Sequence, residues 1–148
     1  MKTLKQLIKL NKLDWANPNI NNENFPYNGR LSKEIKLFHF NRIISSEDAI
    51  KEMAKEGYEP ANIYELLTWA KDNWNGKDVI VALGSAWHNL NGDRNFPFLR
   101  FVGSERDLDL SWFDDGWRAH CRFAAVKKAE SKLPDTLEIN GIKYKRLD

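Results

Sequence analysis

The sequence predicts an α+β fold in which two helices pack on a small antiparallel sheet and long ordered loops join the strands. Helix signals come first along the chain and strand signals follow them, without the alternating βαβ order that indicates a parallel sheet. An Asn-Gly pair between two isoleucines near the C-terminus is a strong hairpin signal. With 148 residues of ordinary globular composition, we expect residues 1–148 to form a single domain.

Residues 1–44 are predicted to be an N-terminal lead-in. Apolar residues at helical spacing, with lysines on the other face, predict a short amphipathic helix within residues 1–13. Residues 17–30 are rich in Asn, Pro and Gly and have no period, which indicates an ordered loop or a linker. Residues 34–44 are apolar and aromatic and predict one or two strands.

Two helices are predicted from their capping residues. Ser45 and Ser46 precede two acids and begin a helix that runs to about Glu56, where a glycine follows. Asn62 and Glu65 have the spacing of a capping box at the start of a second helix, which ends at an Asn-Gly pair. We expect both helices to pack on one sheet.

Extended segments dominate the rest of the chain. A continuous apolar run at residues 79–83 predicts a buried central strand, and residues 122–126 predict another strand. Pro97 predicts a loop or a sheet edge around it, because proline cannot donate a ladder hydrogen bond. Residues 137–147 predict a hairpin that turns at residues 140–141.

Residues 107–112 alternate between apolar and polar side chains. This period of two predicts a strand with one face in the core and the other turned outward. The expected core face is Leu108, Leu110 and Trp112, and the expected outward face is Asp107, Asp109 and Ser111.

Charge and cysteine content limit the classes of function. The formal net charge is +2, so no basic excess indicates a nucleic-acid partner. No apolar run approaches the length of a membrane span, and residues 1–13 lack the apolar core of a signal peptide. We therefore expect a protein that is cytoplasmic at synthesis, and later export by another route stays open. Cys121 is the only cysteine, which leaves no intrachain disulfide and no cysteine-based zinc site, and we expect no cofactor.

The segment from Leu83 to Phe123 interleaves two sets of residues. One set, which we call the frame, combines glycine, proline and large apolar side chains that can fix irregular loops, and the residues between its members form the filler. The frame consists of Gly84, Trp87, Gly92, Pro97, Leu99, Leu108, Leu110, Trp112, Trp117 and Phe123. All fifteen lysines lie outside residues 78–126, whereas five of the eight arginines lie inside. Exclusion of positive charge therefore does not explain the lysine gap, whereas a preference for Arg at stacked contacts or a coding-level process would.

These motifs resemble the target proteins of diversity-generating retroelements. The likeness covers roughly half of the chain and lies in Gly57 to Leu67, Val81 to Trp87, Gly92 to Arg94, Pro97 to Leu99, Leu108 to Phe113 and Trp117 to Lys128. In that family a reverse transcriptase copies a template with errors at adenines, and the copy replaces the variable region of the target gene. Mutated Asn codons then give His, Asp, Ser, Arg, Phe and Asn, among others, but never Lys, which matches the gap.

The resemblance implies a C-type lectin-like fold of the formylglycine-generating-enzyme kind, with residues 79–128 as the variable region. It implies a ligand-binding protein, without catalysis or a metal, that holds an unknown protein or surface ligand through a hypervariable face. The expected ligand-binding positions are His88, Asn89, Asn91, Asn95, Arg100, Phe101, Asp107, Asp109, Ser111, Asp115, Arg118 and His120. The chain lacks the paired disulfides and calcium loop of sugar-binding lectins and the reactive cysteines of formylglycine chemistry, so neither activity is expected.

Two alternatives to a diversified binding protein remain open at this point. Asp107, Asp109 and Asp115 could serve a metal-dependent hydrolase as paired carboxylates. The chain could also be an undiversified structural or interaction relative that keeps only the frame. Its oligomeric state is not indicated by the sequence.

Single residues of the variable region also have more than one interpretation. His88 or His120 could act as a base beside Ser111 or Cys121, although neither spacing matches a known triad or ligand motif. Three of the tryptophans could stack on a sugar or a base, although the frame pattern favours core packing. Those tryptophans are Trp87, Trp112 and Trp117.

Overall fold

The computed structural model describes residues 2–112, 116–128, 136–139 and 142–145. The helices in these ranges are α1 (Leu4–Leu10), α2 (Ser46–Lys55) and α3 (Ile63–Asn73). The strands are β1 (Trp15–Ala16), β2 (Lys36–Phe38), β3 (Tyr58–Pro60), β4 (Ile80–Val81), β5 (Trp87–His88), β6 (Arg94–Val102), β7 (Glu105–Ser111), β8 (Arg122–Lys127), β9 (Thr136–Ile139) and β10 (Ile142–Lys145).

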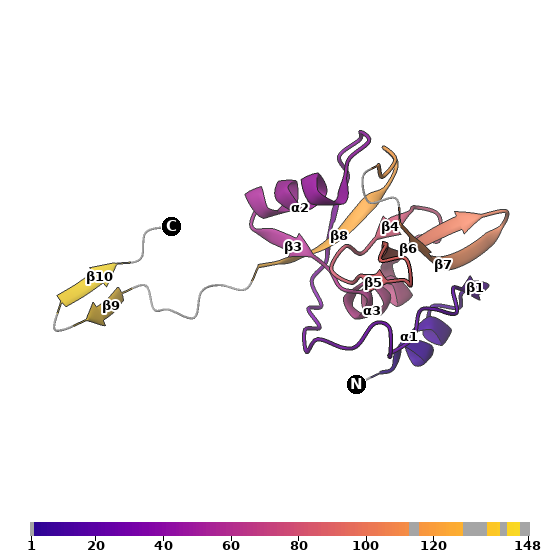
Figure 1. The fold of residues 1–148 in the computed structure, drawn as a ribbon, viewed down its shortest axis with the longest axis horizontal. Helices are drawn as coiled ribbons and strands as arrows, with labels where there is room; N and C mark the ends of the chain where they lie inside the picture. The colour runs from indigo at the N-terminus through magenta and orange to yellow at the C-terminus, as the bar shows by residue number, and fades with distance from the viewer. Residues whose placement is uncertain (1, 113–115, 129–135, 140–141, 146–148) are drawn as a thin grey trace.

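Strands β1 to β8 form one mixed sheet (Figure 1). Its order is β1-β7-β6-β4-β8-β2, and β3 pairs with β8 and β5 with β6 beside this path. β1 is parallel to β7 and β4 is parallel to β8, whereas the other pairs of the sheet are antiparallel. β9 and β10 form an antiparallel pair with Ile139 opposite Ile142, as the hairpin signal predicts, and the turn at residues 140–141 lies outside the described residues.

The expected fold, a C-type lectin-like arrangement of two helices on a small antiparallel sheet, is wrong. The described residues contain three helices, and the sheet has eight strands of mixed direction. The extra strands are short: β1, β3 and β5 have two or three residues each. Such segments carry no periodicity that a sequence could reveal, and they become strands because a longer neighbour offers them an edge.

The predicted helix starts are confirmed. Ser45 begins α2, and its hydroxyl accepts a hydrogen bond from the backbone N–H of Asp48 at 3.0 Å. Asn62 and Glu65 form a capping box at the start of α3, in which each side chain accepts from the other residue's backbone N–H. The opening helix is also present as α1, with Leu4 and Leu7 as its buried face.

Helices cover both faces of the sheet, which therefore lies between two cores. Along β8, Phe123 and Ala125 belong to the core that α2 covers, whereas Ala124 and Val126 belong to the core that α1 and α3 cover. Successive residues of a strand point to opposite faces, so both faces of β8 are apolar. Figure 1 shows α2 on one side of β8 and α1 and α3 on the other. The two predicted helices pack on one sheet, as expected, but from opposite sides.

Pro97 lies inside β6, and the prediction of a loop or sheet edge there is wrong. Its carbonyl accepts a hydrogen bond from the N–H of Ala82 at 3.0 Å. β6 pairs with β5 through residues 94–95 and with β4 through residues 98–99. Pro97 falls between these two pairings, where β6 changes partner and a ladder N–H is not required.

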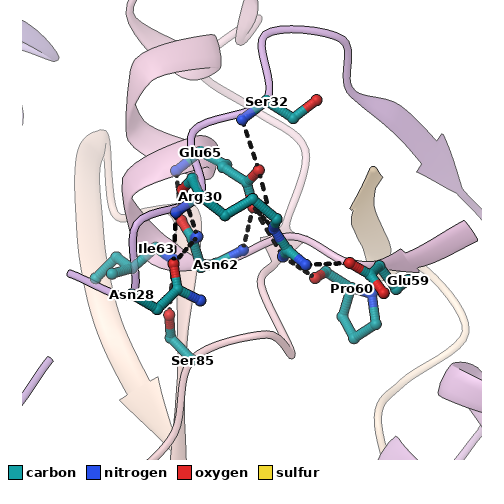
Figure 2. Close-up of polar contacts among 9 residues, drawn as sticks. All are labelled: Asn28, Arg30, Ser32, Glu59, Pro60, Asn62, Ile63, Glu65 and Ser85. Carbon is teal, nitrogen blue, oxygen red and sulfur yellow. Dashed lines mark hydrogen bonds and ion pairs between the residues drawn. The ribbon is translucent and has the colours of Figure 1, made fainter. Parts of the chain in front are cut away.

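A buried carboxylate, Glu65, ties the loop between β1 and β2 to the start of α3 (Figure 2). The Glu65 side chain is fully buried, and it accepts hydrogen bonds from Arg30 Nη2 at 3.0 Å and from the N–H of Ser32 at 2.8 Å. Arg30 also contacts the carboxylate of Glu59 and donates to the carbonyl of Pro60. Buried carboxylates are stable only with such partners, so this contact fixes the N-terminal segment on the sheet.

Within the described residues, no helix combines the length and the apolar character needed to cross a membrane.

Candidate functional site

The candidate site lies on the hairpin formed by β6 and β7. The turn residues Gly103 and Ser104 have φ of +57° and +71°, as the central residues of a type I′ turn require. This turn sets a register in which Arg100 lies opposite Asp107 and Phe98 lies opposite Asp109. Directly opposed residues share a face, so two acids, an arginine and a phenylalanine gather on one side of the hairpin.

Arg100 is held by the two acids of β7. Its Nη2 lies 3.0 Å from Asp109 Oδ2, and its Nε lies 3.8 Å from Asp107 Oδ2. The guanidinium also lies over the ring of Phe98, 5.6 Å from its centroid. Asn17 donates to the other oxygen of Asp109 at 3.0 Å. These contacts fix the orientation of Arg100, and Asp107 and Asp109 balance its charge.

The expectation that Asp107 faces outward is wrong. Its side chain is on the face opposite Leu108, as alternation requires, but that face is covered and Asp107 is only 6% exposed. Trp15 of β1 lies beside it in the register, and Arg100 lies on the other side. A polar alternation identifies a strand's two faces but not what covers the second one.

Next to this cluster the surface forms a groove of about 410 Å³, which we call the cationic groove. Three separate segments line it: the chain before β4, the second half of β6 with the end of β7, and the loop before β8. Its residues are Lys77, Val79, Phe98, Arg100, Phe101, Val102, Ser111, Gly116, Trp117, Arg118, His120 and Cys121. Five of the positions expected to bind ligand line it together: Arg100, Phe101, Ser111, Arg118 and His120.

Lys77 and Arg118 place positive charge on the rim of the cationic groove, where the imidazole of His120 also lies. Lys77, Arg118 and His120 are exposed, and within the described part of the chain none of them forms an ion pair. No aspartate or glutamate occurs among the described residues that line the groove. Among the described residues, Lys77 and Arg118 therefore have no carboxylate partner, whereas Arg100 has two.

The walls of the groove are aromatic and apolar. Trp117 is buried, and its Nε1 donates to the hydroxyl of Ser46 at 2.8 Å, which fixes the indole against α2. Its ring makes edge contacts with Phe98 and Phe123. Phe101 is 44% exposed, so the groove has a rigid inner wall and an open apolar edge.

Four other expected ligand-binding positions lie at the turn between β5 and β6. The side-chain oxygen of Asn89 accepts from the N–H groups of Asn91 and Asp93, both at 3.0 Å. Asn95 is buried, and its amide donates to the carbonyl of Asp93 at 3.0 Å. These asparagines shape the turn, and His88 is exposed beside it.

Half of the frame is buried, and the expectation that all of it is buried is wrong: Trp87 and Leu110 are partly exposed, and Gly84, Gly92 and Trp112 are exposed. Leu99, Leu108, Trp117 and Phe123 are at most 5% exposed. Trp112 is 57% exposed, so the prediction that it packs with Leu108 is wrong. β7 ends at Ser111, and alternation places a side chain reliably only while the strand continues.

The catalytic alternatives gain no support from this geometry. Asp107 and Asp109 both face the Arg100 guanidinium, which would repel a metal cation, and Asp115 lies outside the described residues. Among the described residues, no group of three His, Cys, Asp or Glu side chains is placed to hold a metal ion. Burial raises the pKa of the Cys121 thiol, the opposite of what a nucleophile requires.

Lys77, Val79, Phe98 and Val102 are groove residues that the sequence does not predict. Lys77 lies just outside the lysine-free segment, and the other three are ordinary strand residues. The missed signal is the Gly103-Ser104 pair between two extended runs, since a two-residue hairpin there would place residues 98–102 opposite residues 105–109.

Comparison with protein-family models, with curated proteins and with solved structures finds no match to this chain.

Proposed function

We propose that this chain is a non-catalytic ligand-binding protein whose hypervariable surface is diversified by adenine-directed retroelement mutagenesis. One observation carries the proposal. Arg100, Phe101, Ser111, Arg118 and His120 are filler between frame residues in the sequence, and they line a single groove. Arg, Phe, Ser and His all belong to the residue types that the resemblance implies for mutated Asn codons.

The distribution of burial supports the same proposal. Leu99 and Leu108 are fully buried on the face that α3 covers, whereas Phe101, Arg118 and His120 are exposed. Substitution of exposed side chains away from buried contacts typically changes stability by no more than about 0.5 kcal/mol. A surface of this kind can change its ligand while the core keeps the fold.

The side-chain types in the groove are also suited to binding different ligands. Arginine and histidine offer hydrogen-bond donors, and an exposed phenylalanine offers a rigid apolar anchor that loses little conformational entropy on binding. Three chain segments contribute to the groove, so substitutions in any one of them would alter the same binding surface.

The deciding experiment is to sequence the locus around the coding region. We expect a reverse transcriptase gene and a near-copy of the segment that encodes residues 83–126. Mismatches between the two copies should fall on template adenines and should include the codons for Phe101, Arg118 and His120. Codons for Leu99, Leu108 and Trp117 should match. Absence of a near-copy, or mismatches concentrated on these three buried positions, would show that the surface is not diversified.

A further inference from the structure

The second half of β6 has a strand edge without a neighbour. β4 pairs with β6 only through residues 98–99, so within the described part of the chain no strand pairs with Arg100–Val102 on the side opposite β7. Before β4, the carbonyl of Val79 is directed to β8, where it accepts from the N–H of Arg122 at 2.9 Å. The free edge opens into the cationic groove, which residues 100–102 line.

Two of the three residues on this edge, Phe101 and Val102, are not of the kinds that usually protect a free strand. Natural edges are blunted by lysine, proline or a covering loop. Here Phe101 and Val102 are 44% and 53% exposed, and both are apolar. An exposed apolar edge is suited to accept an extended segment of another chain, with main-chain hydrogen bonds giving affinity and side-chain contacts giving selectivity.

The charges around this edge indicate the sign of the net charge that a bound segment should carry. Lys77, Arg118 and His120 lie on the rim of the same groove without a carboxylate partner in the described residues. Arg100 differs from them, because Asp107 and Asp109 hold its guanidinium. A basic segment would meet the like charges of Lys77 and Arg118, whereas an acidic segment would offer them carboxylates.

We propose that the cationic groove binds an extended acidic segment of a protein partner, which adds to the free edge of β6 at Arg100–Val102. Carboxylates of the segment pair with Arg118 and Lys77, and its apolar side chains pack on Phe101 and Phe98. The inference rests on the proposed ligand-binding function and specifies its partner. A small aromatic acid would satisfy the charge but would leave the strand edge unpaired.

A peptide selection tests the inference and does not require the natural partner to be identified. A phage-displayed library of random heptapeptides is panned on the immobilised full-length protein, with the Arg118→Glu variant as the counter-selection. We expect enriched peptides to alternate Asp or Glu with apolar residues. Enrichment of neutral or basic peptides, or of none, would overturn the acidic-segment assignment.

Variants then locate the binding of an enriched peptide by fluorescence anisotropy. Arg118→Glu should weaken binding at least about tenfold, since an attractive pair becomes a repulsive one. Phe101→Ala should weaken it about fivefold through lost apolar contact. Lys51→Glu makes the same charge change on the exposed surface of α2 and should alter affinity less than about twofold. Equal effects of the Arg118 and Lys51 substitutions would mean that the peptide is held by general charge attraction and does not bind in the groove.

Two further measurements separate strand addition from small-molecule binding. N-methylation of alternate peptide amides removes the main-chain donors and should weaken binding at least about tenfold. Free benzoate should not displace the peptide at millimolar concentration, and displacement would assign the groove to a small acid.

The two proposals can fail separately. Groove-dependent binding of neutral or basic peptides would retain ligand binding and reject only the acidic partner. Binding of acidic peptides by a protein whose locus lacks a template copy would retain the partner and reject diversification.

Discussion

Removal of the Glu65 carboxylate should destabilise the protein more than any surface substitution. The side chain is fully buried and accepts hydrogen bonds from Arg30, from the N–H of Ser32 and from the N–H of Asn62. In Glu65→Ala all of these donors lose their acceptor at once. The loop between β1 and β2 and the first turn of α3 would both be left with unsatisfied groups (Figure 2).

The magnitude follows from the number and kind of the lost partners. Breaking a buried ion pair by removing one member typically costs about 3–5 kcal/mol. Arg30 is about one-third exposed and keeps its contact with Glu59, so water and that acid recover part of the loss. We therefore expect about 3 kcal/mol for Glu65→Ala, from the lower end of that range. Glu65→Gln keeps one acceptor and should cost about 1–3 kcal/mol.

Urea denaturation followed by tryptophan fluorescence measures these losses as differences in the free energy of unfolding. Thermal unfolding should agree, with a fall in Tm of roughly 2–4 °C per kcal/mol for a chain of this size. Glu59→Gln is the matched control, because Glu59 contacts the same arginine from a partly exposed position and should cost less than about 1 kcal/mol. A loss below about 1 kcal/mol for Glu65→Ala would refute the assignment of Glu65 as the fixed point of this segment.

The next predictions concern the packing of two residues and the pH dependence of stability. In Gly84→Ala the new Cβ would lie 2.5 Å from the carbonyl oxygen of Ala61, so we expect a loss of at least about 1–3 kcal/mol in a urea titration. Leu108→Ala should cost about 2–5 kcal/mol, whereas Leu90→Ala, at a fully exposed leucine, should change stability by less than about 0.5 kcal/mol. Burial raises the pKa of the Cys121 thiol, so the unfolded thiol ionises first and stability should fall as the pH rises above about 8.5. Cys121→Ala should reduce that alkaline decline, and an unchanged decline would assign it to other groups.

Local chemistry determined which elements could be predicted from the sequence. The starts of α2 and α3 depend on Ser45 and on the Asn62-Glu65 pair, whose partners are at most three residues away. Cap and turn signals of this kind survive in almost any tertiary context. The hairpin of β9 and β10 was predictable for the same reason, since an Asn-Gly pair favours one two-residue turn.

The rest depended on pairings between distant residues. β1 pairs with β7 across more than ninety positions, and nothing in Trp15–Ala16 indicates that it is a strand. The burial of Asp107 follows from the register of β6 against β7, which brings Arg100 to it. Alternation in a single strand cannot supply that information, because a covered polar face and a solvated one have the same period.

Arg100 has a proposed role in ligand binding and a structural role in the hairpin. It lines the cationic groove, where diversification is proposed, and it also balances the buried carboxylate of Asp107. A residue such as Arg118 can change freely, but loss of Arg100 alone would leave Asp107 buried without a cation, which costs several kcal/mol in well-buried pairs. We therefore expect Arg100→Ala to destabilise the protein by about 1–3 kcal/mol, and Arg100→Ala combined with Asp107→Asn to recover at least half of that loss. Sibling copies of the gene should accordingly replace positions 100 and 107 together, whereas positions 118 and 120 should vary independently, and equal independence at all four would mean that the Arg100 cluster does not constrain the surface.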